Sequence, residues 1–142
     1  MAKSSPNGWR SVVLPSDPAA IPPFQQSIEA ELSALKVSKP DRFAIQLSLE
    51  EALVNAVKHG NRCDPSKKVH IRYAIRPDNF EVEISDEGPG FRPDTVPDPL
   101  AAENMERPGG RGLLLMKHYM TEVAIVPPGN TLSMKRRYEV VG

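Results

Sequence analysis

The chain has 142 residues, of which 39% are hydrophobic and 25% are charged, a balance typical of one soluble globular domain. Its 18 Lys and Arg residues equal its 18 Asp and Glu residues, which excludes a net basic field that would recruit nucleic acid or an anionic membrane. The single cysteine, Cys63, excludes an intrachain disulfide and a thiolate metal cluster. Because no stretch approaches the length of a membrane span, we expect a cytoplasmic protein with no membrane partner.

The first third of the chain predicts one strand and one helix. Residues 1–8 are polar and contain Pro6 and Gly8, so we expect a disordered lead-in to a single domain over residues 9–142. A strand is predicted from Trp9 to Leu14. Apolar residues then recur with a helical period, which predicts an amphipathic helix from about Phe24 to Val37, after a run of prolines.

A second helix is predicted from Pro40 or Asp41 to a stop at Gly60. Glu51 and Asn55 lie four residues apart, so both side chains point to one helical face. That polar stripe, which His59 continues, separates two apolar arcs. The arcs consist of Phe43, Leu47, Val54 and Val57 on one side, and of Ile45, Leu49, Ala52 and Ala56 on the other. Polar groups between buried flanks need partners, which a ligand can supply; the alternative is an ordinary solvated strip.

The rest of the chain predicts two hairpins separated by a long connection and a helix. Strands are predicted over residues 68–76 and 79–85, the connection over 92–111, with a short helix near 100–105, a helix over 113–120, and strands over 121–126 and 131–138. The connection is rich in proline and is typical of a lid or a disordered segment. This order predicts an α+β two-layer sandwich, with a mainly antiparallel mixed sheet and helices on one face.

Two glycine-rich segments flank the long connection. Asp86-x-Gly88-x-Gly90 follows a strand, where glycines allow close approach of a ligand and the carboxylate can accept a hydrogen bond from an amine; the alternative is a tight turn. Gly109-Gly-Arg-Gly112 opens a helix, whose free N–H groups favour phosphate; the alternative is a flexible loop. It is neither a P-loop nor a dinucleotide fingerprint.

The three segments in this order resemble the ATP-binding boxes of the GHKL, or Bergerat-fold, superfamily. The stretches Glu-Ala-Leu-Val-Asn-Ala-Val-Lys-His-Gly, Asp-Glu-Gly-Pro-Gly-Phe and Gly-Gly-Arg-Gly-Leu-Leu-Leu-Met are similar to those of the anti-sigma factor serine/threonine protein kinases. The resemblance covers about residues 9–139. It implies a Bergerat-type sandwich with an ATP lid at about 92–111.

The resemblance also implies roles for individual residues. Glu51 would be the catalytic base, Asn55 would hold a Mg²⁺ ion that bridges the ATP phosphates, and Asp86 would bind the adenine amine. A carboxamide oxygen suits Mg²⁺, which keeps several waters and phosphate oxygens around it. Phosphoryl transfer needs mainly positioning and charge neutralisation, so a base, a metal and a glycine-rich clamp are sufficient.

The remaining ATP-binding candidates are glycines, two cations and a threonine. The resemblance implies that Gly88 and Gly90 shape the adenine site, that Gly110 and Gly112 bring N–H groups to the phosphates, and that Thr131 lies near the adenine. Two cations, Lys58 and Arg111, are within reach of phosphate oxygens in this scheme; the alternative is that both are solvated.

The resemblance implies two protein partners. One is a sigma factor that the protein sequesters, and the other is an anti-anti-sigma factor of the STAS type that it phosphorylates, and a homodimer is implied as well. The alternative is a nucleotide-dependent binding module without significant kinase activity. A base at Glu51 favours the kinase, because a pure binder has no need of one there.

Overall fold

The computed structural model describes residues 3–4, 8–88, 110–126 and 130–138. Its strands are β1 (Lys3–Ser4), β2 (Arg10–Pro15), β3 (Lys68–Ile75), β4 (Asn79–Ser85), β5 (Glu122–Val126) and β6 (Thr131–Arg137). Its helices are α1 (Ile21–Ala34), α2 (Lys39–Val54) and α4 (Gly110–Tyr119), with a 3₁₀ turn at Pro18–Ala20 and a π-helical turn, η2, at Asn55–Gly60. The predicted α+β sandwich is confirmed.

The described strands form one sheet in the order β1-β2-β3-β4-β6-β5. We expected a mainly antiparallel but mixed sheet, whereas every described strand pairing is antiparallel. The hairpin between β3 and β4 pairs Ile75 with Phe80, as the alternating pattern predicts. At the edge, Lys3 pairs with Ser11, so part of the expected disordered lead-in is a short strand.

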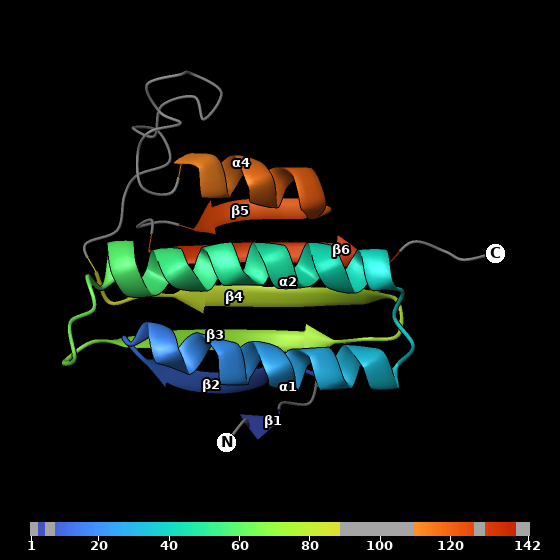
Figure 1. Cartoon of the computed structure of the whole chain (residues 1–142), viewed down its shortest axis with the longest axis horizontal. Helices are drawn as coiled ribbons and strands as arrows, with labels where there is room; N and C mark the ends of the chain where they lie inside the picture. Colours follow the sequence, from blue (N-terminus) through green and yellow to red (C-terminus); the bar gives the residue numbers. More distant parts are fainter. Residues whose placement is uncertain (1–2, 5–7, 89–109, 127–129, 139–142) are drawn as a thin grey trace.

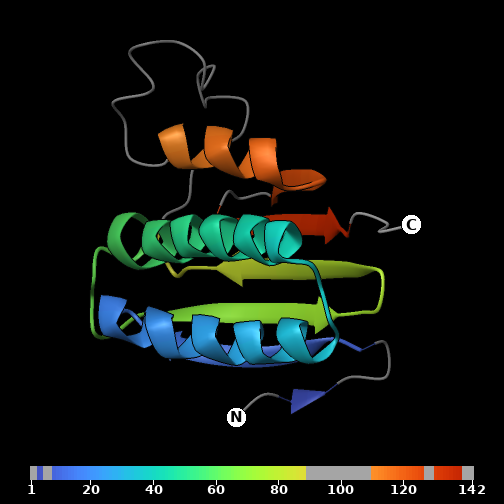
Figure 2. The same ribbon diagram turned by 45° about the vertical axis from the view of Figure 1, so that its right-hand side comes forward.

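The helices α1, α2 and α4 cover the same face of the sheet, with α2 between the other two (Figures 1 and 2). The sheet turns its apolar residues to this layer, including the buried Val69, Ile71 and Tyr73 of β3 and Phe80 of β4. Since α2 packs against both neighbouring helices as well as the sheet, a side chain on its flank can face another element rather than solvent. None of the helices in the described part of the chain is long and apolar enough to cross a membrane.

Both predicted helix starts are shifted by their capping chemistry. Helix α1 begins at Ile21 rather than Phe24, because prolines are tolerated in a first turn, where the N–H groups have no intrahelical partner. It ends at Ala34, before Lys36, which has a φ of 60°. Helix α2 begins at Lys39, capped by Ser38, whose hydroxyl oxygen accepts the Asp41 N–H at 3.3 Å.

The two flanks of α2 differ more than the sequence predicts. The arc that contains Ile45, Leu49, Ala52 and Ala56 is buried, as expected. Phe43 of the other arc is 58% exposed and makes an edge-to-face contact with Tyr119 of α4, with 5.9 Å between the ring centroids. This flank is therefore the seam between α2 and α4.

An ion pair fixes the far end of that seam. The Arg136 guanidinium of β6 binds the Asp41 carboxylate, with Nη2 to Oδ1 at 2.8 Å, and also donates to the Tyr119 carbonyl oxygen at the end of α4. The Asp41 side chain is 1% exposed, and burying a carboxylate is tolerated only when it is paired. One arginine thus ties α2, α4 and β6 together and helps to set the position of α4.

Candidate functional site

Glu51 and Asn55 of the central helix face the first turn of α4. A Cβ atom built on Gly112 would lie 2.9 Å from Glu51 Oε2 and 3.1 Å from Asn55 Nδ2, which is closer than ordinary contacts. Gly112 is buried, and the two polar side chains are half-buried. The glycine therefore lets the N-terminal turn of α4, with its free N–H groups, approach a carboxylate and a carboxamide.

The helix that carries this pair changes type at Asn55. We predicted one α-helix to Gly60, but α2 ends at Val54 and residues Asn55 to Gly60 form a π-helical turn. Its wider ring is closed by the Asn61 N–H, which donates to the Ala56 carbonyl oxygen at 2.9 Å. Such turns are rare and often occur at functional sites.

The π-helical turn also decides where its polar residues lie. Lys58 and His59 are both exposed, so His59 does not continue a half-buried stripe of Glu51 and Asn55 as an α-helical projection predicts. A contact between Lys58 and phosphate stays a prediction. Long cationic side chains on an exposed turn can reach a ligand without being buried beforehand.

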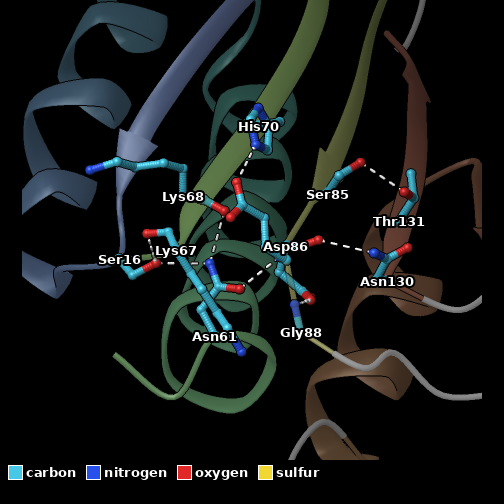
Figure 3. Close-up of polar contacts among 11 residues, drawn as sticks. Ser16, Asn61, Lys67, Lys68, His70, Ser85, Asp86, Gly88, Asn130 and Thr131 are labelled. Atoms are coloured by element: carbon cyan, nitrogen blue, oxygen red, sulfur yellow. Dashed lines mark hydrogen bonds and ion pairs between the residues drawn. The ribbon is translucent and has the colours of Figure 1, made fainter. Parts of the chain in front are cut away.

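Asp86 lies directly after β4 and is held on both sides. Its Oδ1 atom accepts the Gly88 N–H at 2.9 Å, its own N–H donates to the Asn130 carbonyl oxygen at 3.0 Å, and the Asn130 amide donates to the Asp86 carbonyl oxygen at 3.1 Å (Figure 3). Partial burial raises the pKa of the Asp86 carboxyl above its ordinary value, against the opposing hydrogen bond from Gly88 and the charge of Lys67. The carboxylate is thus oriented and partly desolvated.

Gly60 and Gly88 bring two segments into direct backbone contact beside Asp86. A Cβ on Gly60 would lie 2.2 Å from Asp86 Oδ2, and a Cβ on Gly88 would lie 2.0 Å from the Gly60 carbonyl oxygen. We predicted Gly60 as the C-terminal stop of the helix, and Gly60 is the last residue of the π-helical turn. Among the described glycines the one with positive φ is Gly8, so Gly60 is not required for a left-handed conformation. Gly60 is needed here because a side chain would occupy the place of the Asp86 carboxylate.

Replacing Gly60 by alanine is expected to lower the free energy of unfolding by about 1–3 kcal/mol, the usual cost of overpacking a close contact. Denaturant unfolding measures this change. Gly8→Ala is the matched control, because a Cβ on Gly8 meets nothing within 4 Å and only its φ of 85° is strained. The two variants should differ in ATP affinity, with only Gly60→Ala weakening it; equal affinities would contradict the close packing of Gly60 on Asp86.

Thr131 lies across the sheet from the residue that precedes Asp86. It pairs with Ser85 in the β4–β6 ladder, and the two hydroxyl oxygens are 2.7 Å apart (Figure 3). Thr131 therefore lies beside the end of β4 that leads to Asp86, and its place near the adenine stays a prediction.

Several predicted residues cannot be compared with the structure. Gly90, most of the connection at 92–111 and the short helix near 100–105 lie outside the described residues. Gly110 is the first residue of α4, and Arg111 follows it, but the Arg111 side chain is outside the description. Their predicted contacts with phosphate stay predictions.

The residues that hold Asp86 in place carry no clear signal in the sequence. Asn61 follows the predicted helix stop, Asn130 lies between the last two predicted strands, and Ser16 follows the first predicted strand. Asparagine is common in turns, so nothing in the local pattern distinguishes these from solvent-exposed loop residues. Only the packing of distant segments gives them partners.

The described residues fit a Mg²⁺ ion that is held largely by its ligand. No group of three or more His, Cys, Asp or Glu side chains that could hold a metal lies within the described ranges. Asn55 and Glu51 nevertheless supply two oxygen-bearing groups next to a helix N-terminus. Mg²⁺ commonly uses one or two protein oxygens and completes its shell with phosphate and water, so this donor set suits it.

The arrangement of the site places this domain in the Bergerat class of ATP-binding domains. The central helix carries an acidic and an amide side chain, an aspartate follows a neighbouring strand, and a helix that begins with glycine lies across the seam. The family model of the histidine kinase-like ATPase domain matches residues 14–136. The chain therefore belongs to that family.

Three relatives show where the chain lies within this group. It is 26% identical over 135 residues to the serine-protein kinase RsbW of Bacillus licheniformis, covering 86% of this chain and 81% of the relative. It is 27% identical over 118 residues to RsbW of Bacillus subtilis, covering 79% and 74%. It is 31% identical over 85 residues to the anti-sigma F factor of Oceanobacillus iheyensis, covering 58% of each chain.

A solved structure gives the same fold. The crystal structure of the RsbU and RsbW domains of Rv1364c from Mycobacterium tuberculosis superposes with a TM-score of 0.65 at 16% identity, covering 92% of this chain. This chain spans about a third of that longer protein, since it covers 32% of it. At this identity the comparison establishes the fold.

Proposed function

We propose that this protein is an ATP-dependent serine/threonine protein kinase and anti-sigma factor. It phosphorylates an anti-anti-sigma factor of the STAS type and sequesters a sigma factor. The observation that carries the proposal is the pair Glu51 and Asn55 facing Gly112 at the start of α4. This juxtaposition offers a base, an oxygen ligand and a phosphate-binding helix end at one place.

Each residue has a defined part in the proposed reaction. A serine hydroxyl oxygen of the partner attacks the γ-phosphorus of ATP, the bond to the bridging oxygen of ADP breaks, and the Glu51 carboxylate accepts the hydroxyl proton. Asn55 would hold a Mg²⁺ ion, which would supply positive charge to neutralise the phosphates. Asp86 binds the adenine amine, with Thr131 nearby, and Gly110, Gly112, Lys58 and Arg111 contact the phosphates.

The names of the relatives support the choice of partners. Two are named serine-protein kinases and a third is named an anti-sigma factor, and the matches cover 86%, 79% and 58% of this chain. A homodimer and a cytoplasmic location belong to the same proposal. The Gly88 and Gly90 backbone completes the adenine side of the site in this scheme.

The decisive experiment incubates the purified protein with Mg²⁺, labelled ATP and candidate partners encoded beside its gene. We expect label on a serine or threonine of a small partner, and a stable complex with a sigma factor. Complex formation without label would leave the alternative, a nucleotide-dependent binding module. Absence of both ATP binding and complex formation would reject the proposal as a whole.

A further inference from the structure

Asn61 is a buried polar residue at the meeting point of four segments. Its side chain is 0% exposed, although it follows the exposed end of the π-helical turn η2. Its Nδ2 group donates to Ser16 Oγ at 2.8 Å and to the Lys68 carbonyl oxygen at 2.9 Å, and its Oδ1 atom accepts the Glu87 N–H at 2.7 Å (Figure 3). Both donors and an acceptor are therefore used.

Among the groups that Asn61 binds, the Glu87 N–H lies next in the chain to Asp86, which binds the adenine amine in the proposed function. Glu87 lies between Asp86, whose carboxylate is oriented, and Gly88, whose N–H orients it. The Asn130 amide donates to the Asp86 carbonyl oxygen, and Asn61 Oδ1 accepts the N–H of the next residue, Glu87. The backbone that carries the Asp86 carboxylate is thus held by two asparagines from distant parts of the chain.

We propose that Asn61 is a positioning residue for nucleotide recognition. By accepting the Glu87 N–H it holds the turn so that the Asp86 carboxylate faces the exocyclic amine of adenine. This inference rests on the proposed function, in which Asp86 reads the adenine. Asn61 itself contacts no nucleotide in this scheme.

The close contacts around the turn make its position sensitive to Asn61. The Gly60 carbonyl oxygen leaves no room for a Cβ on Gly88, so the turn cannot move toward η2. Without the Asn61 acceptor, the Glu87 N–H would regain a partner only by moving outward to water. That movement takes the Asp86 carboxylate with it.

Ser16 sets the orientation of the Asn61 amide. The Ser16 hydroxyl donates to the Lys67 carbonyl oxygen at 2.7 Å and accepts from Asn61 Nδ2, so its position is fixed from both sides. Ser16 is 5% exposed. Removing this hydroxyl should loosen the amide without removing the acceptor for Glu87, which gives a milder variant.

The test compares the affinities of ATP and ITP by calorimetric titration in the presence of Mg²⁺. ITP carries an oxygen where adenine carries its exocyclic amine, so it has no N–H at that position to donate to Asp86. In Asn61→Ala we expect about tenfold weaker ATP binding with little change for ITP, because the variant removes the hold on a single hydrogen-bonding carboxylate. In Ser16→Ala we expect the ratio of ATP affinity to ITP affinity to fall by about two- to threefold.

Asn79→Ala is the matched control. Asn79 is 8% exposed, begins the same strand that ends at Ser85, and also uses both ends of its amide, toward Arg76 and Asp78. It should lower thermal stability and leave the ratio of ATP to ITP affinity unchanged.

The outcomes separate the inference from the function on which it rests. A lower ratio of ATP affinity to ITP affinity in Asn61→Ala supports the positioning role. An unchanged ratio together with lowered thermal stability overturns it. If Asn61→Ala does not fold, the ratio in Ser16→Ala decides in the same way. Wild-type protein that fails to bind ATP, or binds ITP equally well, would instead overturn the proposed nucleotide site.

Discussion

Replacing Glu51 by glutamine is expected to lower the rate of phosphoryl transfer by about 10²–10⁴-fold, the usual contribution of a general base. Glutamine keeps the size and the hydrogen-bonding shape of the side chain beside Gly112 but cannot take up the serine proton. ATP affinity should change little, because the adenine contacts lie elsewhere. Single-turnover transfer from labelled ATP, with ATP binding measured separately, tests both parts.

Glu50→Gln is the control for this substitution. Glu50 is the preceding residue on α2, has the same chemistry and is exposed, so it should transfer phosphate at the wild-type rate. Phosphoryl transfer at the wild-type rate in Glu51→Gln would show that Glu51 is not the general base. A parallel loss of ATP affinity would instead indicate that Glu51 acts mainly by orienting the Mg²⁺ ion or its waters.

Replacing Asp86 by asparagine is expected to weaken ATP binding by about 10- to 100-fold, the loss of a charged hydrogen bond. Asp86 Oδ1 already accepts the Gly88 N–H, which leaves Oδ2 for the ligand among the described contacts. An amide would keep its oxygen on that N–H and turn its NH₂ group toward the adenine amine, placing a donor against a donor. Calorimetric titration measures the loss, and wild-type affinity would refute the adenine role.

The same substitution should stabilise the protein without nucleotide. Burial raises the pKa of the Asp86 carboxyl in the folded state, so its protonated form favours folding below the ordinary pKa of 3.8, and this contribution is lost as the pH rises through the raised value. Asp86→Asn should therefore have the higher free energy of unfolding at neutral pH. The difference should shrink as the pH falls toward 3.8.

Asp64→Asn is expected to change the free energy of unfolding in the opposite direction. The Ser66 hydroxyl and N–H hold the pKa of the Asp64 carboxyl below its ordinary value, so its contribution to stability is present at neutral pH and is lost on acidification. This variant should be less stable than wild type at neutral pH and should bind ATP normally. If the free energy of unfolding depended on pH in the same way in the two variants, the partial burial of Asp86 would be contradicted.

Strands and helices were predictable wherever one periodic face is buried. The alternation of Val69, Ile71 and Tyr73 predicts β3, and their burial confirms it, because a strand that faces one helical layer must alternate. The segments that carry Glu51, Asp86 and Gly112 were identified from their residues and order together with their resemblance to the GHKL boxes. Their juxtaposition across α2 and α4 follows from the fold, and their catalytic and binding roles stay predictions.

Local periodicity and short motifs predict the fold class and the order of most elements, and the resemblance to the GHKL boxes adds the three segments that form the candidate site. Three features are visible only in the folded chain: the central helix becomes π-helical at Asn55, Gly60 is required by the nearby Asp86 carboxylate, and Asn61 is buried. Gly60 and Asn61 have their partners far away in the chain. Local patterns carry no record of such partners, because packing and hydrogen bonding between segments select them only when the sheet and helices come together.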